Sequence, residues 1–290
     1  MKTTIGIYEN RINFRGDCIV FSEGRDSSID KIVLESLLSD LPKPPKICPL
    51  GTSFHLKSAS DAFKYSVSDD LNNYTQNWCF IIDRDHHTYD DINKEWNNLK
   101  KGKAPKLLYW RKKEIENYLL DPSLLKKSDL LIDYTIEDLK HKIVKYANRY
   151  LYMFAVNQVI IQVREELKGC WIKLYKDFGQ FKNFEDSIKQ LTKNKCFEKH
   201  LNRHGELITI ESLKQNVIKA LIDYTGNEQY CIEWGKGTWQ DLMPGHELLY
   251  GVLSELKIDP HKIITEILVE KNNLPEDFKI LRNYFEKYTQ

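Results

Sequence analysis

The sequence predicts an α/β protein, in which a parallel sheet flanked by helices is followed by a mostly α-helical C-terminal region. Two observations lead to this class. Up to about residue 110, short apolar runs of strand length alternate with longer stretches of helical periodicity, a pattern typical of parallel strands joined by crossover helices. From about residue 121, amphipathic helical patterns replace the strand-like runs.

Four strands are expected in the first region, because four short runs rich in β-branched and aromatic residues have strand length. These runs are residues 18–21, 46–50, 78–82 and 106–110. Helices are expected over 28–41 and 58–73, where apolar residues recur at helical spacing. Residues 3–17 are expected to form a small N-terminal strand or hairpin. We therefore place a first domain at residues 1–125.

The second region, residues 126–290, is predicted to be helical. A long helix is expected over 136–168, and two amphipathic helices are expected to end at Gly205 and Gly226, because glycine commonly follows the last residue of a helix. The aromatic-rich stretch 146–163 has little polar surface. It is predicted to be either core or one face of a homodimer.

Composition excludes several classes of protein. With 290 residues, 41% of them hydrophobic, the chain can bury a core. No apolar run approaches the roughly 20 residues that span a bilayer, and the N-terminal stretch lacks the apolar segment of a secretion signal. Six scattered cysteines without a C-x-x-C pair predict reduced thiols and a cytoplasmic protein. The absence of Walker A and G-x-S-x-G motifs argues against an ATPase and a serine hydrolase.

Acidic residues directly follow two of the predicted strands. Glu23 and Asp26 follow the first strand, and Asp83 and Asp85 follow the third. In an open parallel sheet, functional groups collect beyond the carboxyl ends of the strands, where converging carboxylates repel one another unless a cation neutralises them. Oxygen ligands of this kind suit Mg²⁺ or Mn²⁺. The alternative is that Asp26 caps a helix and Asp85 caps a turn.

A third pair of acids, Glu114 and Glu116, follows the fourth strand at the end of a basic run. From Lys94 to Lys113 the chain has eight Lys and Arg residues and one acid. A basic run is commonly only a solvated face, but beside a carboxylate–metal site and interleaved with aromatic residues it suits a phosphate backbone. The aromatic residues are Trp96, Tyr109 and Trp110, and the predicted nucleic-acid-binding residues are Lys101, Lys103, Lys106, Arg111, Lys112 and Lys113.

The order of these motifs resembles a known family. E-G-x-D at 23–26 after a first strand, and D-x-D at 83–85 after a later one, are similar to the TOPRIM catalytic fold of topoisomerases, primases and OLD-type nucleases. The stretches EIENYLLDP and WQDLMPGHELL more narrowly resemble standalone TOPRIM proteins with the domain of unknown function 4435. These include the effector nuclease of the PARIS anti-phage system. The resemblance covers roughly residues 15–125, with a short motif at 238–250.

The resemblance implies roles for individual residues. The implied catalytic and metal-binding acids are Glu23, the glutamate that such enzymes cannot lose, Asp26 as the second acid of the first motif, Asp83 and Asp85 as metal ligands, and Glu116 as the glutamate of I-E-N-Y. One position departs from the family, because His246 stands where a lysine is expected in the late motif. A histidine is charged only part of the time near neutral pH, so Lys236 and Lys262 are candidate substitutes.

The predicted function is a Mg²⁺- or Mn²⁺-dependent endonuclease, because one or two bound metals stabilise the charge that develops as a phosphodiester is cleaved. The resemblance implies a toxic effector of anti-phage defence that forms a homodimer, as its relatives do, and that cleaves tRNA once an ATPase partner releases it. Two alternatives stay open. One is an OLD-type nuclease acting on DNA, and the other is a non-catalytic module that binds nucleic acid or a partner.

A zinc site in the stretch 196–204 is not favoured. Cys196, His200 and His204 are spaced four residues apart and share one face of an expected helix. However, no fourth ligand lies nearby in the sequence, and no catalytic glutamate stands between the histidines. We therefore expect a structural or surface role for these three residues.

Overall fold

The computed structural model describes residues 18–65, 78–84, 87, 89–103, 107–166, 172–195, 198 and 209–288. The chain divides into two compact units: Met1–Leu131 with Ile258–Gln290, here the sheet unit, and Ile132–Lys257, here the helical unit. The predicted α/β class with a helical C-terminal region is confirmed. The predicted N-terminal strand or hairpin lies outside the described residues.

Within the described residues, the sheet has four strands, all parallel, in the order β2-β1-β3-β4. They are β1 (Ile19–Ser22), β2 (Lys46–Pro49), β3 (Trp78–Ile82) and β4 (Leu107–Tyr109), so a strand lies at each of the four predicted positions. Because the strands are parallel, their carboxyl ends share one edge of the sheet. We call this the carboxyl edge.

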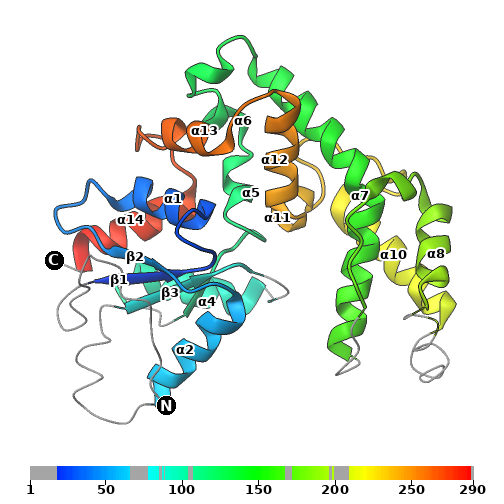
Figure 1. Cartoon of the computed structure of the whole chain (residues 1–290), viewed down its shortest axis with the longest axis horizontal. Helices are drawn as coiled ribbons and strands as arrows, with labels where there is room; N and C mark the ends of the chain where they lie inside the picture. Colours follow the sequence, from blue (N-terminus) through cyan, green and yellow to red (C-terminus); the bar gives the residue numbers. More distant parts are fainter. Residues whose placement is uncertain are drawn as a thin grey trace. The chain divides into compact units, whose positions relative to one another are not determined.

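Helices cover both faces of the sheet (Figure 1). Helix α2 (Ser53–Tyr65) packs on one face, where Leu56 joins a buried cluster with alternate residues of β1 and β3. On the other face lie α1 (Ile29–Leu38) and α14 (Glu276–Tyr288), which contact each other, and α14 also contacts α4 (Tyr89–Lys100). The two predicted crossover helices are therefore present, with α2 beginning five residues earlier than expected.

Helix α4 was not predicted, and it changes the meaning of the basic run. Its buried residues Ile92, Trp96 and Leu99 recur at helical spacing, and the indole of Trp96 donates from Nε1 to the Tyr109 carbonyl (2.7 Å). Trp96 and Trp110 are each 1% exposed. The expectation that these two indoles contact nucleic acid is therefore wrong, because both belong to the core of the sheet unit.

The segment after residue 257 packs with the sheet unit, whereas we had assigned all of 126–290 to one helical region. Helix α13 (Pro260–Ile267) contacts α1 and α6 (Pro122–Leu125). Arg282 of α14 pairs with Asp40 just after α1 (Nη2 to Oδ2, 2.7 Å). The helical unit is thus a segment inserted between two parts of the sheet unit.

The helical unit is built on α7 (Ile136–Glu166). Helices α8 (Phe184–Lys193), α10 (Ile210–Thr225) and α12 (Gly245–Glu255) each contact α7. Most of its residues from Leu151 to Val163 are buried, which places this part of the aromatic-rich stretch in the core of the unit. Helix α10 ends at Gly226 in the left-handed conformation (φ 68°), as predicted, whereas Gly205 lies outside the described residues.

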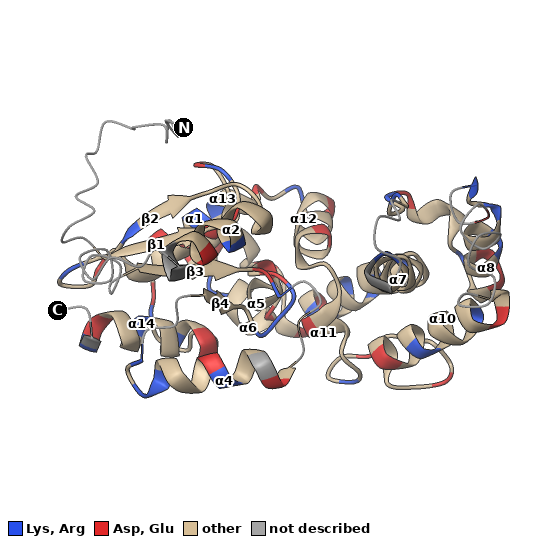
Figure 2. Cartoon of the chain, turned by 90° about the horizontal axis from the view of Figure 1, so that it is seen from below, with Lys and Arg blue, Asp and Glu red and all other residues tan. Residues whose placement is uncertain are grey.

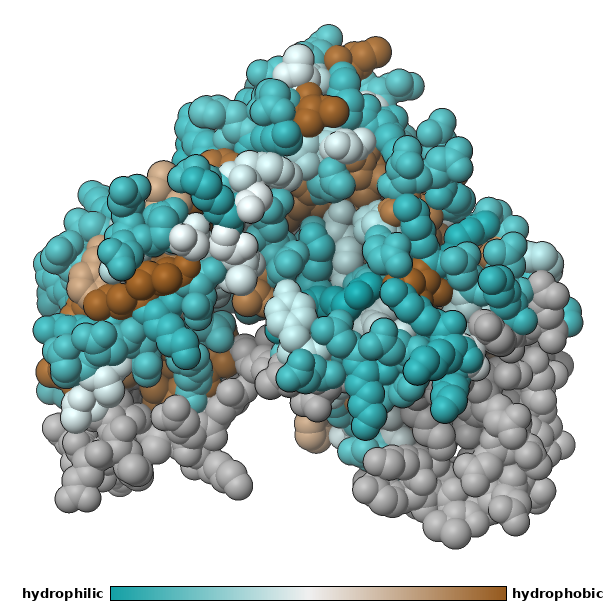
Figure 3. Space-filling model, turned by 180° about the vertical axis from the view of Figure 1, so that it is seen from behind, coloured by the Kyte–Doolittle hydropathy of each residue, from teal (hydrophilic) through white to brown (hydrophobic). Residues whose placement is uncertain are grey.

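The described surface carries mixed charge and scattered apolar groups. Figure 2 shows acidic and basic residues side by side on both α4 and α14. Hydrophilic residues cover most of the face drawn in Figure 3, where hydrophobic residues form separate patches. No helix within the described ranges is both long enough and apolar enough to cross a membrane.

Candidate active site

The turn after β1 is built around Gly24, which follows Glu23. Gly24 has a positive φ of 85° and exchanges two backbone hydrogen bonds with Gly51 after β2: Gly24 N donates to the Gly51 carbonyl (2.6 Å), and Gly51 N donates to the Gly24 carbonyl (2.9 Å). A Cβ atom on Gly24 would lie 2.3 Å from Cβ of Ser28. Only glycine fits here, and the turn holds Glu23 at the carboxyl edge.

We expect Gly24→Ala to destabilise the protein more than Gly51→Ala. Both glycines have positive φ, which costs an alanine about 1–3 kcal/mol, but at Gly51 (φ 90°) the nearest atom to an added Cβ is Nδ1 of the His55 side chain, at 3.1 Å. At Gly24 the added Cβ would strike the residue that caps α1. Urea denaturation compares the free energies of unfolding, and equal losses for the two variants would contradict this account of Gly24.

Glu23 and Asp83 meet at the carboxyl edge because β1 and β3 are neighbours in the sheet. The backbone N–H of Asp83 donates to Oε1 of Glu23 (3.1 Å). Oδ1 of Asp83 is shielded from solvent and has no hydrogen-bond partner among the described residues. A shielded carboxylate oxygen without a partner is costly, and it is an available ligand atom.

Asp30, which sequence analysis missed, joins these two acids. It lies in the first turn of α1, whose N-terminus follows the Gly24 turn. Burial raises the pKa of Asp30 well above its ordinary value, and the negative charges of Glu116, Glu23 and Glu114 raise it further. The signal that could have found it is the position of Asp30 two residues after the capping Ser28, on a first turn directed at the carboxyl edge.

Asp26, which we had assigned to the metal site, lies elsewhere. Its carboxylate pairs with the ammonium of Lys31 (2.9 Å) and its side chain is 54% exposed. The cap of α1 is Ser28, whose side chain accepts from Lys31 N, so the alternative role of Asp26 as a helix cap is also not seen. Asp26 belongs to the surface in this structure, and Asp30 stands where the second acid was expected.

Two glutamates from the segment after β4 complete the group. Glu116 is the first residue of α5 (Glu116–Leu119) and is only 6% exposed. Burial raises the pKa of Asp83 well above its ordinary value, as do the charges of its acidic neighbours. Those neighbours are Asp30, Glu23, Glu114 and Glu116. We call Glu23, Asp30, Asp83, Glu114 and Glu116 the acid cluster; Asp85 lies outside the described residues.

The acid cluster is a candidate site for a divalent cation. In the described part of the chain, no group of three or more His, Cys, Asp and Glu side chains already has the spacing of a metal site. The donors nevertheless suit Mg²⁺ or Mn²⁺, because they are carboxylate oxygens and one of them, Oδ1 of Asp83, is shielded and unpartnered. A cation would also remove the repulsion that raises the pKa values of Asp30 and Asp83.

The predicted nucleic-acid-binding residues are divided between two edges of the sheet. Lys101 and Lys103 are exposed and lie after α4, which returns the chain to the edge where β4 begins. Lys112 and Lys113 follow β4 and lie at the carboxyl edge with the acid cluster. Arg111 also follows β4, but its guanidinium pairs with Asp277 and lies 5.2 Å from the Trp96 ring centroid. Lys106 lies outside the described residues.

Arg84 is a second residue that sequence analysis missed. It is 6% exposed and lies between the two acids of the D-x-D motif. Its Nη1 donates to the Arg111 carbonyl (2.9 Å), its Nε donates to the His87 carbonyl (3.1 Å), and its guanidinium stacks 3.8 Å from the Tyr89 ring centroid. Arg84 therefore ties together the segments that follow β3 and β4.

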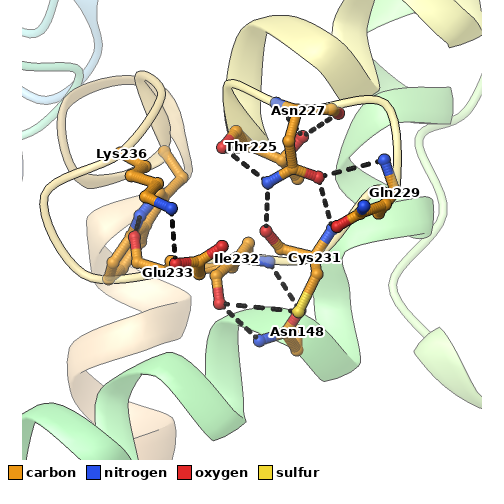
Figure 4. Close-up of polar contacts among 9 residues, drawn as sticks. Asn148, Thr225, Asn227, Gln229, Cys231, Ile232, Glu233 and Lys236 are labelled. Atoms are coloured by element: carbon orange, nitrogen blue, oxygen red, sulfur yellow. Dashed lines mark hydrogen bonds and ion pairs between the residues drawn. The ribbon is translucent and has the colours of Figure 1, made fainter.

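The late motif lies in the helical unit, on α11 (Trp239–Leu242) and α12. His246 is exposed and its ring lies 4.2 Å from that of Tyr250. Lys236 pairs with Glu233 (2.7 Å) in a loop held by two asparagines, as Figure 4 shows: Asn148 binds both backbone groups of Ile232, and Asn227 bonds to Cys231. Within the helical unit, then, Lys236 has a local partner. Cys196, His200 and His204 lie outside the described residues.

Comparisons with known proteins add no relative. No family model matches the chain, and neither a curated protein nor a solved structure matches it.

Proposed function

We propose that the sheet unit is a divalent-metal-dependent phosphodiesterase that acts on nucleic acid. The observation that carries the proposal is the convergence of five carboxylates from four segments on one edge of a parallel sheet, where burial and the charges of the neighbouring acids raise the pKa values of Asp30 and Asp83. A fold gains no stability from such a group unless a cation binds to it. Groups with perturbed pKa values gather at functional sites more often than elsewhere.

In this proposal the metal is held by Glu23, Asp30 and Asp83 together with Glu114 and Glu116, whose charges act on Asp30 and Asp83. A bound Mg²⁺ or Mn²⁺ would supply charge stabilisation for the attacked phosphate and activate a water molecule. Lys112 and Lys113, at the same edge, would attract the phosphate backbone. Nucleic acid is favoured over a small phosphate ester by the TOPRIM resemblance of the motifs.

The TOPRIM resemblance of the motifs extends the proposal to a particular activity. We propose an endoribonuclease that cleaves tRNA as a toxic effector of anti-phage defence, released from an ATPase partner and acting as a homodimer. DNA cleavage of the OLD type is the alternative substrate. His246 of the late motif and Lys236 stay candidates that the resemblance alone implies.

The experiment that tests the proposal is a cleavage panel. Purified protein with Mg²⁺ or Mn²⁺ is offered total tRNA, single-stranded DNA and duplex DNA, together with the variants Glu23→Gln and Glu35→Gln. Glu35 is a matched control because it lies on the exposed side of the neighbouring helix α1, near Lys31. We expect discrete tRNA fragments from wild type and Glu35→Gln, and a loss of more than about 100-fold for Glu23→Gln.

The results of the cleavage panel distinguish a ribonuclease from a DNA nuclease and from a non-catalytic binding module. Cleavage of DNA alone would show that the same site acts on DNA and not on tRNA. Full cleavage by Glu23→Gln would place the chemistry outside the acid cluster. If no substrate is cleaved, calorimetry with Mn²⁺ decides: a protein that binds no metal at the cluster is a binding module and not a phosphodiesterase.

A further inference from the structure

Tyr118 and Asp277 form a buried hydrogen-bonded pair two residues beyond Glu116. Tyr118 lies on α5 and Asp277 lies in the first turn of α14, and the two are 4% and 3% exposed. The Tyr118 hydroxyl donates to Oδ2 of Asp277, while Arg111 pairs with the other carboxylate oxygen. Burial, together with the charge of Asp277, raises the pKa of Tyr118 well above its ordinary value, so the hydroxyl keeps its proton.

The same hydroxyl oxygen accepts two backbone hydrogen bonds. The N–H of Arg111 donates to it at 3.0 Å and the N–H of Lys112 donates to it at 3.1 Å. Leaving a buried backbone donor without a partner costs about 1–3 kcal/mol. Tyr118 therefore fixes the start of the segment 111–117, which we call the acid-bearing loop because it carries Glu114 and Glu116.

Further contacts fix the rest of the acid-bearing loop. The side chain of Arg84 donates to the Arg111 carbonyl, and the backbone N–H of Arg84 donates to the Lys113 carbonyl (3.0 Å). The backbone N–H of Glu114 donates to Oδ1 of Asn117 (3.0 Å), and Asn117 is itself 2% exposed. Most of the backbone of the loop is thus tied down, as expected for a segment that must hold charged ligands in place.

Helix α14 supports Tyr118 by packing as well as by charge. The ring of Phe278, the residue after Asp277, lies 5.1 Å from the ring of Tyr118 and 5.7 Å from that of Trp110. Pairs of aromatic rings at such distances add to the stability gained from burial alone. The position of the hydroxyl is therefore set by a helix that is 159 residues away in the sequence.

We infer that Tyr118 and Asp277 are positioning residues that hold the acid-bearing loop so that Glu114 and Glu116 face Asp30 and Asp83. Helix α14 thereby controls the affinity of the acid cluster for a divalent cation. This inference rests on the proposed metal site. Outer-shell partners of metal ligands commonly change metal affinity by about 10–100-fold when they are replaced.

The test is a calorimetric titration of the full chain with Mn²⁺, accompanied by amide hydrogen exchange without metal. The variants are Tyr118→Phe, which removes the hydroxyl, and Asp277→Asn, which removes the charge that holds it. Asp40→Asn is the matched control, because Asp40 ties α14 to the end of α1 through Arg282 and, among the described residues, makes no hydrogen bond to the acid-bearing loop. We expect Mn²⁺ affinity to fall about 10–100-fold in the first two variants only, with faster exchange at Arg111 and Lys112.

Two results would overturn the inference while leaving the metal site intact. One is wild-type Mn²⁺ affinity in Tyr118→Phe and Asp277→Asn. The other is an equal loss of affinity in Asp40→Asn, which would indicate general loosening of α14. If either variant fails to fold, the other decides. If the wild-type protein itself binds no Mn²⁺, the proposed metal site fails first, and the inference fails with it.

Discussion

Replacing Asp30 with asparagine is expected to abolish metal-dependent cleavage and, at the same time, to raise the melting temperature of the metal-free protein at neutral pH. The two effects have opposite signs because Asp30 is a ligand when metal is present and a source of repulsion when it is absent. We expect cleavage to fall by more than about 100-fold. Each kcal/mol of repulsion that the substitution removes would raise the melting temperature by roughly 2–4 °C for a chain of this size.

Asp26→Asn is the control, and it decides between two interpretations of the first motif. Asp26 pairs with Lys31 at the surface, and such pairs contribute about 0–1 kcal/mol, so both activity and melting temperature should stay close to wild type. Thermal melts in EDTA and cleavage assays in Mg²⁺ measure the two effects. If Asp26→Asn is inactive and Asp30→Asn is active, the metal ligand is Asp26 of the E-G-x-D motif and not Asp30 of the acid cluster.

Metal-free protein is expected to lose stability as the pH rises from about 5 to 8. Asp30 and Asp83 have raised pKa values in the folded state, whereas unfolded aspartates titrate near pH 4. Between those values the folded state binds more protons than the unfolded state, so stability falls with rising pH. The stability that these two protonated aspartates contribute is fully present below the pKa of an unfolded aspartate. It is lost as the pH rises through their pKa values in the folded state.

Added Mg²⁺ should reverse this trend, because the metal competes with protons for the same oxygens. Melting temperatures measured from pH 5 to 8, with EDTA or with Mg²⁺, would show a stabilisation by metal that grows with pH. Asp30→Asn should flatten the metal-free profile. Asp40→Asn should leave this slope in place, because Arg282 lowers the pKa of Asp40 and its contribution is lost only as the pH falls. A flat metal-free profile for the wild type would contradict the proposed repulsion.

The sheet was predictable from the sequence because each strand is a compact apolar run bounded by polar residues. The positions of Glu23, Asp83 and Glu116 followed from it, since parallel strands bring their carboxyl ends to one edge. Helix α4 was not predicted because charged and amide side chains separate its three buried residues. The basic residues of the same stretch favoured the interpretation of an exposed, phosphate-binding run. Trp96 and Trp110 were misassigned for the same reason.

The places of Asp30 and Asp277 in the fold could not be predicted from the spacing of the motifs. Asp30 lies seven residues after Glu23 and joins it only because the Gly24 turn and the first turn of α1 reverse the chain. Asp277 reaches Arg111 across 166 residues, a separation over which local sequence carries no information. Both residues depend on tertiary packing, which a single sequence does not display.

The insertion of the helical unit within the sheet unit has a consequence for biosynthesis. A ribosome completes all four strands before it begins the helical unit, but Asp277 and Phe278 emerge only after residue 257. A nascent chain shorter than this has the acid-bearing loop without the carboxylate that fixes Tyr118. Contacts between such distant residues form late, because a long intervening chain must first be ordered. Translation order thus delays assembly of a proposed toxic site until most of the chain has been made.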